Sequence, residues 1–177
     1  MKKRILLTYF DISLKNQQSN YSDGLLLEVT KLELLPHDLT FLHQLPVDVQ
    51  LASDRVIEKI NAIQPDYIIC CGMAASRTQL SVEAGASWKE IVLQTEVDFE
   101  ELVAGAVAIE ISHDCGKFVC VRVADAPEGV YYSVLDYLSQ NQLTARCIFV
   151  HVPVLNQENL SGILADFVLI INKLALS

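Results

Sequence analysis

Positive charge is scarce in this sequence of 177 residues. Thirteen Lys and Arg stand against 22 Asp and Glu, so the formal net charge is −9. Proteins that bind nucleic acid or an anionic membrane surface usually have a basic excess, since neutralisation of phosphates supplies most of their affinity. The only basic cluster is Lys2, Lys3 and Arg4. We therefore expect a protein that binds neither nucleic acid nor a membrane.

Long apolar runs are also missing. No uninterrupted run approaches the roughly 18 residues that a membrane span needs. Residues 5–10, which follow the basic start, are apolar but shorter than the core of a usual signal peptide, and Asp11 follows them without a small-residue cleavage site. The sequence thus predicts a cytoplasmic protein, in which the five cysteines are reduced thiols.

The sequence lacks the motifs that bind nucleotides and zinc. Neither GxxxxGK[ST] nor GxGxxG after a strand occurs. Cys70 and Cys71 are adjacent in an expected strand, so their side chains point to opposite faces and cannot bind one metal ion together. His113 and Cys115 could share a face, yet the CxxC and HExxH spacings of zinc sites are absent. We therefore expect no metal and no cofactor.

What the sequence has in abundance is apolar residues. They make up 51% of the chain, while 20% of its residues are charged and the mean hydropathy is +0.31. This is the opposite of the composition of disordered chains. The length suits one domain with a continuous core, and no internal repeat or linker interrupts it, so we expect a single domain over residues 1–177.

Short apolar runs alternate with helical patterns along the chain. Runs that suit strands buried on both faces cover residues 5–10, 67–71 and 147–152. Apolar residues recur at helical spacing over residues 47–63, 130–138 and 160–174. We interpret residues 16–24 as a surface loop, and periodicity leaves residues 102–111 open between a strand and a buried helix. The alternation predicts an α/β fold.

A cysteine, a histidine and a carboxylate are the residues with the clearest chemical potential. Cys120 ends one apolar segment, His151 lies near the end of the expected strand 147–152, and Glu83 follows a small-residue turn after residues 67–71. A nucleophilic cysteine needs a general base, and that base needs a third group to fix its orientation. Most single Cys and His residues in buried strands are core packing instead. The residues alone leave both interpretations open.

Several segments that include these residues resemble the pyroglutamyl peptidase I family, cytosolic cysteine peptidases that remove N-terminal pyroglutamate. The similar segments are residues 5–11, 44–47, 65–77 followed by Glu83, 112–120 and 149–153. By this resemblance Cys120 is the nucleophile, His151 the base and Glu83 the residue that orients the base. The resemblance also implies a phosphorylase/hydrolase-like, three-layer α/β/α fold with a central, mostly parallel mixed sheet, and a homo-oligomer.

The same resemblance implies that Phe10, Met73, Phe118 and Val119 contact the substrate. Two positions depart from the family: Ser13 stands where the family has a second phenylalanine against the lactam ring, and Met73 replaces a lactam-binding glutamine. The stretch between Glu83 and Cys120 is also shorter than in the family. We therefore expect a peptidase that hydrolyses an N-terminal pyroglutamyl or related small acyl amide in a small peptide or amide substrate. The alternative is a diverged, non-catalytic homologue that binds a small molecule or a protein.

Overall fold

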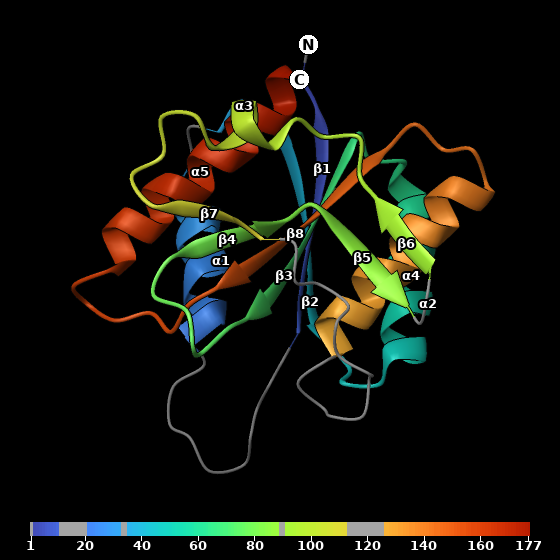
Figure 1. Cartoon of the computed structure of the whole chain (residues 1–177), viewed down its shortest axis with the longest axis horizontal. Helices are drawn as coiled ribbons and strands as arrows, with labels where there is room; N and C mark the ends of the chain where they lie inside the picture. The colour runs from blue at the N-terminus through green and yellow to red at the C-terminus, as the bar shows by residue number, and fades with distance from the viewer. Residues whose placement is uncertain (1, 11–20, 33–34, 89–90, 113–125) are drawn as a thin grey trace.

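A computed structural model of the chain describes residues 2–10, 21–32, 35–88, 91–112 and 126–177 (Figure 1). Strands and helices alternate along most of the chain. The strands are β1 (Arg4–Phe10), β2 (Asp38–Leu45), β3 (Tyr67–Met73), β4 (Leu80–Glu83), β5 (Gly85–Trp88), β6 (Ile91–Gln94), β7 (Ile109–Ser112) and β8 (Arg146–Val152). The helices are α1 (Tyr21–Lys31), α2 (Val49–Ile63), α3 (Phe99–Val103), α4 (Ala126–Gln140) and α5 (Leu160–Leu176).

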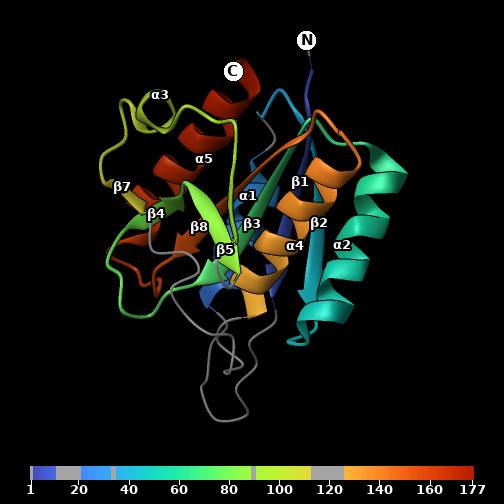
Figure 2. The same ribbon diagram turned by 45° about the vertical axis from the view of Figure 1, so that its right-hand side comes forward.

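A six-stranded sheet forms the centre of the fold, with the strand order β2-β1-β3-β8-β4-β7. Neighbouring strands are parallel except for β4, which runs antiparallel to β8. Helices α1 and α5 cover one face of the sheet and α2 and α4 the other, as the two views in Figures 1 and 2 agree. The expected three-layer α/β/α architecture with a mostly parallel mixed sheet is therefore confirmed. Strands β5 and β6 form a separate two-stranded ribbon beside α4.

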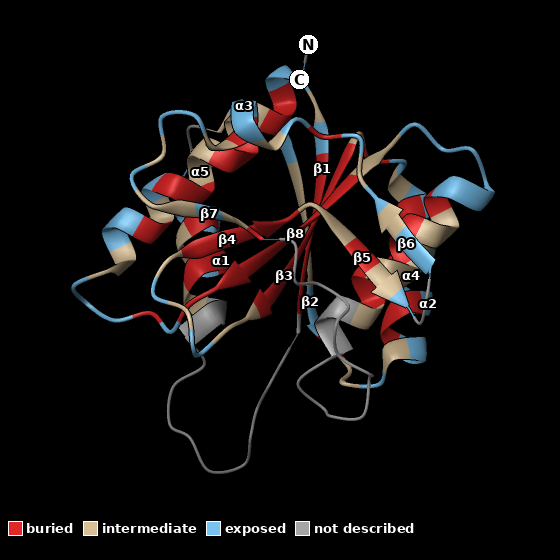
Figure 3. Ribbon diagram, in the orientation of Figure 1, coloured by how far each residue is buried: buried red, intermediate tan, exposed pale blue. Residues whose placement is uncertain are grey.

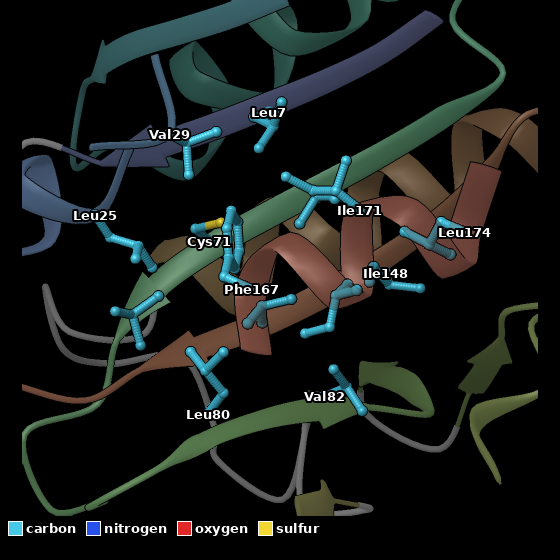
Figure 4. Packing of buried hydrophobic residues seen from close by; sticks show 14 of the residues in the cluster. Leu7, Leu25, Val29, Cys71, Leu80, Val82, Ile148, Phe167, Ile171 and Leu174 are labelled. Atoms are coloured by element: carbon cyan, nitrogen blue, oxygen red, sulfur yellow. The ribbon is translucent and has the colours of Figure 1, made fainter. Parts of the chain in front are cut away.

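The central strands are buried on both faces, which explains their continuous apolar runs (Figure 3). Successive side chains of a strand point to opposite faces, so each strand supplies two cores. Leu80, Val82 and Ile148 pack with Phe167 of α5 on one face (Figure 4). Cys71 belongs to that core, whereas Cys70 lies in the core under α2 and α4. This confirms that the two adjacent thiols face in opposite directions.

Local signals fix where α2 begins and ends. The side chain of Asp48 accepts a hydrogen bond from the Leu51 backbone N–H at 2.9 Å, which satisfies a donor that the first turn leaves unpaired. At the other end Gln64 adopts a left-handed conformation with φ of 45° and donates its N–H to the Ile60 carbonyl. The chain then turns directly into β3.

The structure confirms the helical patterns over residues 47–63, 130–138 and 160–174, which correspond to α2, α4 and α5, and the three apolar runs are β1, β3 and β8. The predicted loop over residues 16–24 is wrong for residues 21–24, which form the first turn of α1, while residues 16–20 lie outside the described part. Residues 102–111 contain the end of α3 and the start of β7. Among the described residues, no helix is both long and apolar enough to cross a membrane.

Candidate active site

Two of the predicted site residues lie on adjacent strands of the sheet. Glu83 is the last residue of β4, and His151 is the penultimate residue of β8. In the antiparallel register Ser81 lies opposite His151, and Glu83 lies opposite Phe149. Because opposed residues and residues two apart share a face, all four side chains belong to the face of the sheet that α2 and α4 cover.

Glu83 and His151 are joined by a short hydrogen bond. The distance from His151 Nε2 to Glu83 Oε1 is 2.6 Å. Glu83 is completely buried and only 7% of His151 is exposed. A carboxylate only accepts hydrogen bonds, so Nε2–H is the donor when Glu83 is ionised, and Nδ1 is then the ring nitrogen that can take up a proton. The pair therefore has the geometry of a general base held by a carboxylate.

The imidazole is also packed against an aromatic ring. Phe149, two residues before His151 on β8, meets it edge to face with the ring centroids 4.7 Å apart. Phe149 itself contacts Tyr131 of α4 at a centroid distance of 5.6 Å. These contacts restrict the rotation of the His151 ring, since both aromatic partners are fully buried.

Arg77, in the turn after β3, reaches the same carboxylate. Its Nη2 lies 3.5 Å from Glu83 Oε1 and 3.3 Å from the hydroxyl of Ser112. Its Nη1 lies 3.7 Å from Glu110 of β7. The guanidinium thus joins the carboxylate on β4 to two residues of the neighbouring strand.

The first turns of α4 lie over this group. The Tyr131 hydroxyl donates a hydrogen bond to the Glu83 backbone carbonyl at 3.2 Å. On the other side, Ser112 at the end of β7 pairs in register with Glu83. Residues 113–125 connect Ser112 to α4, so this segment starts next to Glu83 and leads into α4 five residues before Tyr131.

The remaining predicted site residues are less completely placed. Cys120, Phe118 and Val119 lie outside the described residues, as does Ser13, and the side chain of Phe10 is not described either. Met73, the last residue of β3, is half-buried and lies beside Val152 in the parallel register. It is therefore one position beyond Gly72, which is the register partner of His151.

Three other thiols are core residues. Cys70 and Cys147 lie on neighbouring strands with their sulfurs 3.8 Å apart, and Cys71 is buried on the opposite face. Burial raises the pKa of the Cys71 thiol and that of the Cys147 thiol, because a thiolate is poorly solvated in the apolar core. These two groups remain protonated at neutral pH and are poor nucleophiles. Within the described ranges, no three His, Cys, Asp or Glu residues gather closely enough to hold a metal ion.

Comparison with known proteins identifies relatives that are named pyrrolidone-carboxylate peptidases. The pyrrolidone-carboxylate peptidase of Thermoanaerobacter sp. (strain X514) is 25% identical over 138 residues, which are 63% of this chain and 64% of the relative. A second such peptidase, from Oceanobacillus iheyensis, is 24% identical over 148 residues, or 70% of this chain and 71% of that protein. This chain is similar, at low sequence identity, to members of the pyrrolidone-carboxylate peptidase family. No family model matches it.

Solved structures of this family share the fold. Pyroglutamyl peptidase I from Bacillus amyloliquefaciens superimposes with a TM-score of 0.79 at 21% identity, over 100% of this chain and 97% of the other. Pyrrolidone carboxyl peptidase from Thermococcus litoralis gives a TM-score of 0.75 at 13% identity, over 98% and 93% of the two chains. The matched part spans 64% of the Thermoanaerobacter relative, just under two thirds of its length.

Sequence reasoning overlooked several residues of this site. Arg77 lies in the segment 65–77 that resembles the family, yet its place beside Glu83 could not be foreseen because β4 is short and has two polar residues. The contact of Tyr131 with Glu83 crosses 48 residues of sequence. Only the antiparallel pairing of β4 with β8 brings these groups together.

Proposed function

We propose that this chain is a cysteine peptidase that hydrolyses an N-terminal pyroglutamyl, or related small acyl, amide bond through Cys120, His151 and Glu83. The observation that supports it is the buried 2.6 Å hydrogen bond between Glu83 and His151. A buried acid and base on adjacent strands, in a chain whose relatives are named pyrrolidone-carboxylate peptidases, fit this activity better than core packing does.

The position of Cys120 in the sequence is compatible with this role. It follows Ser112, the register partner of Glu83, by eight residues, and it precedes Ala126, the first residue of α4, by six. An extended chain advances about 3.3–3.6 Å per residue, so the eight residues after Ser112 can span the short distance to His151, whose partner Glu83 pairs with Ser112.

In the proposed reaction Cys120 transfers its thiol proton to Nδ1 of His151, and the thiolate sulfur bonds to the carbonyl carbon of the scissile amide. The tetrahedral intermediate breaks its C–N bond as His151 returns the proton to the leaving amine. The shortened peptide departs and a thioester remains. Water then attacks the thioester with His151 as base, which releases the free acid and restores the thiol.

The substrate is proposed to be a small peptide or amide, bound by Phe10, Met73, Phe118 and Val119. Met73 has a weakly accepting thioether and no strong hydrogen-bond donor. A site that recognises a polar group through hydrogen bonds loses much of its selectivity without them. We therefore propose that the acyl group is held mainly by apolar contacts, and that selectivity for pyroglutamyl over other small acyl groups is low.

The test is turnover of fluorogenic amides by the purified protein. We expect hydrolysis of a pyroglutamyl amide, loss of activity in Cys120→Ala, and measurable activity on prolyl and acetyl-amino-acid amides. Cys115→Ala is the matched control, because it removes a thiol five residues away and should leave activity unchanged. Turnover that persists in Cys120→Ala would exclude Cys120 as the nucleophile, and no turnover of any amide would favour the non-catalytic binding protein.

Alkylation gives a second readout on the same variants. Iodoacetamide at neutral pH should label Cys120 fastest, as located by peptide mapping. Cys71 and Cys147 are internal controls for slow labelling because burial raises the pKa of both thiols. Equal labelling of Cys120 and Cys115 would contradict an activated nucleophile.

Two further expectations remain predictions, namely a cytoplasmic protein and a homo-oligomer. The ribbon of β5 and β6 exposes Trp88, Ile91 and Val92, by 43%, 59% and 63%. Subunit contact would cover this apolar surface. Light scattering coupled to size-exclusion chromatography measures the oligomeric state directly.

A further inference from the structure

We propose that Arg77 is a positioning residue for the Glu83–His151 pair, which it holds by pairing with the buried carboxylate and joining it to the end of β7. The inference rests on the proposed function for its kinetic consequences. Its structural part concerns the hydrogen bond between Glu83 and His151 and can be tested without turnover.

The first argument is the burial of Glu83. A carboxylate with no exposed surface loses its hydration, and it stays ionised only when hydrogen bonds and a positive charge compensate. His151 alone does not provide that charge when it is neutral, which is the state a general base needs. The guanidinium of Arg77 provides a positive charge 3.5 Å from the same oxygen that accepts the bond from His151.

The second argument is the partial burial of the guanidinium itself. The side chain of Arg77 is 22% exposed, whereas its other carboxylate partner, Glu110, is 55% exposed. The ion pair with Glu110 is therefore largely screened by water and contributes little. The interaction with the fully buried Glu83 is screened least, so the charge of Arg77 acts mainly on the carboxylate that holds His151.

The third argument is geometric. Nη2 of Arg77 contacts both Glu83 and Ser112, while Nη1 faces Glu110. A planar guanidinium holds these contacts at fixed angles, which the single ammonium group of lysine cannot do. Ser112 is the last described residue before the segment that contains Cys120. Arg77 thus ties the start of the proposed nucleophile's segment to the carboxylate that orients the base.

The turn that presents Arg77 is held by backbone hydrogen bonds. The N–H of Ala74 donates to the Val152 carbonyl at 2.8 Å, and the N–H of Arg77 donates to the Ala74 carbonyl at 3.1 Å. Neither bond uses the arginine side chain. Replacement of that side chain should therefore leave the turn and the neighbouring end of β8 in place.

The test compares Arg77→Met, Arg77→Lys and the control Arg55→Met, which removes one positive charge from the exposed face of α2. We expect Arg77→Met to lower kcat by roughly tenfold to a hundredfold, the range found when outer-shell partners of metal ligands are removed. KM should change less than about twofold, since Arg77 is not proposed to touch the substrate. Arg77→Lys should recover part of the loss because it keeps the charge, and Arg55→Met should match the wild type.

A spectroscopic measurement separates this inference from the proposed function. The chain has four histidines, so ¹⁵N-histidine labelling gives a simple spectrum, and His151→Gln assigns the relevant signals. The hydrogen-bonded Nε2–H proton of His151 should give a downfield resonance in the wild type and in Arg55→Met. In Arg77→Met it should weaken or shift upfield, because a carboxylate that is protonated or displaced is a poorer acceptor.

Each outcome decides the matter. A changed His151 signal in Arg77→Met supports the inference even if no variant hydrolyses any amide, which would remove only the proposed function. An unchanged signal together with an unchanged kcat in Arg77→Met would overturn it. If Arg77→Met does not fold, Arg77→Lys decides, since full retention of both kcat and the His151 signal would then indicate a purely structural arginine.

Discussion

Charged residues lie at both ends of the central sheet, but the two groups differ in burial and in their hydrogen-bond partners. At the end where β1, β3 and β8 begin, Lys3, Arg4, Asp66 and Arg146 line a cavity of about 530 Å³, next to where the two chain ends lie in Figure 1. Near the end of β8, the charged groups are Glu83, His151 and Arg77. In the first set Arg4 is exposed and the other three residues are partly exposed, whereas in the second set Glu83 and His151 are buried and Arg77 is partly exposed.

Charges at the first end mainly satisfy the backbone. The Asp66 carboxylate accepts the backbone N–H of Arg4 at 2.8 Å, and the Arg4 guanidinium donates to the Ile63 carbonyl at 3.0 Å. Ile63 is the last residue of α2, where carbonyl groups lack partners within the helix and cations are favourable. At the other end the partners are side chains, so the charges act on one another. Proton-transfer chemistry requires the second arrangement.

Of the variants considered, Glu83→Gln should have the largest effect, and that effect should be on kcat. The amide keeps the shape of the side chain but gives His151 no charge, and it can stabilise the wrong tautomer of the ring. If the proposed function holds, kcat falls by roughly 10⁴-fold, as when the aspartate of a serine protease triad becomes asparagine. Stopped or steady-state assay of a fluorogenic pyroglutamyl amide measures it, with circular dichroism as the check that the fold persists. A fall in kcat of less than tenfold would contradict the proposed role of Glu83 in orienting His151.

Tyr131→Phe tests how much the hydrogen bond from α4 to the Glu83 carbonyl contributes to stability. Loss of the hydroxyl removes the hydrogen bond to the Glu83 carbonyl, and that buried acceptor loses a partner. We expect the free energy of unfolding to fall by about 1–2 kcal/mol. Urea denaturation measures the change. An unchanged unfolding midpoint would show that α4 is held over the site by apolar packing alone.

Asp66→Asn is the same acid-to-amide change at the opposite end of the sheet, where Asp66 is partly exposed, and it should give the opposite pattern to Glu83→Gln. Asparagine can still accept from the Arg4 N–H, but without the charge, so stability should fall by about 0.5–1 kcal/mol. Activity should equal that of the wild type. A loss of kcat greater than twofold in this variant would contradict the prediction that the charges at this end of the sheet do not affect activity.

Ser81→Ala should have the smallest effect. The Ser81 hydroxyl is fully buried opposite His151 and has no hydrogen-bond partner among the described residues. Removal of an unsatisfied polar group is close to neutral or stabilising, so we expect the free energy of unfolding to rise by about 0–1 kcal/mol. Thermal unfolding measures this. A tenfold loss of activity at unchanged stability would instead make Ser81 part of the site.

The sequence predicted the three longest helices and three of the central strands because each has a strong local pattern, whereas β2, the longest strand, was not predicted. The apolar runs of β1, β3 and β8 and the periodicity of α2, α4 and α5 are visible without any tertiary contact. The start of α1 was missed because residues 22–24, Ser-Asp-Gly, favour a turn. Strand β4 was missed because two of its four residues are Ser81 and Glu83, and polar residues in so short a segment suggest a loop.

By itself, therefore, the sequence determined the α/β class and the two-sided burial of the central strands, and it indicated His151 and Glu83 as candidate site residues. It could do so because apolar periodicity and recognisable segments are local properties of the chain. The tertiary structure decided that β4 runs antiparallel to β8, which buries Glu83 against His151 and places Arg77 beside both. That arrangement depends on register between strands 68 residues apart in sequence, which no local pattern encodes.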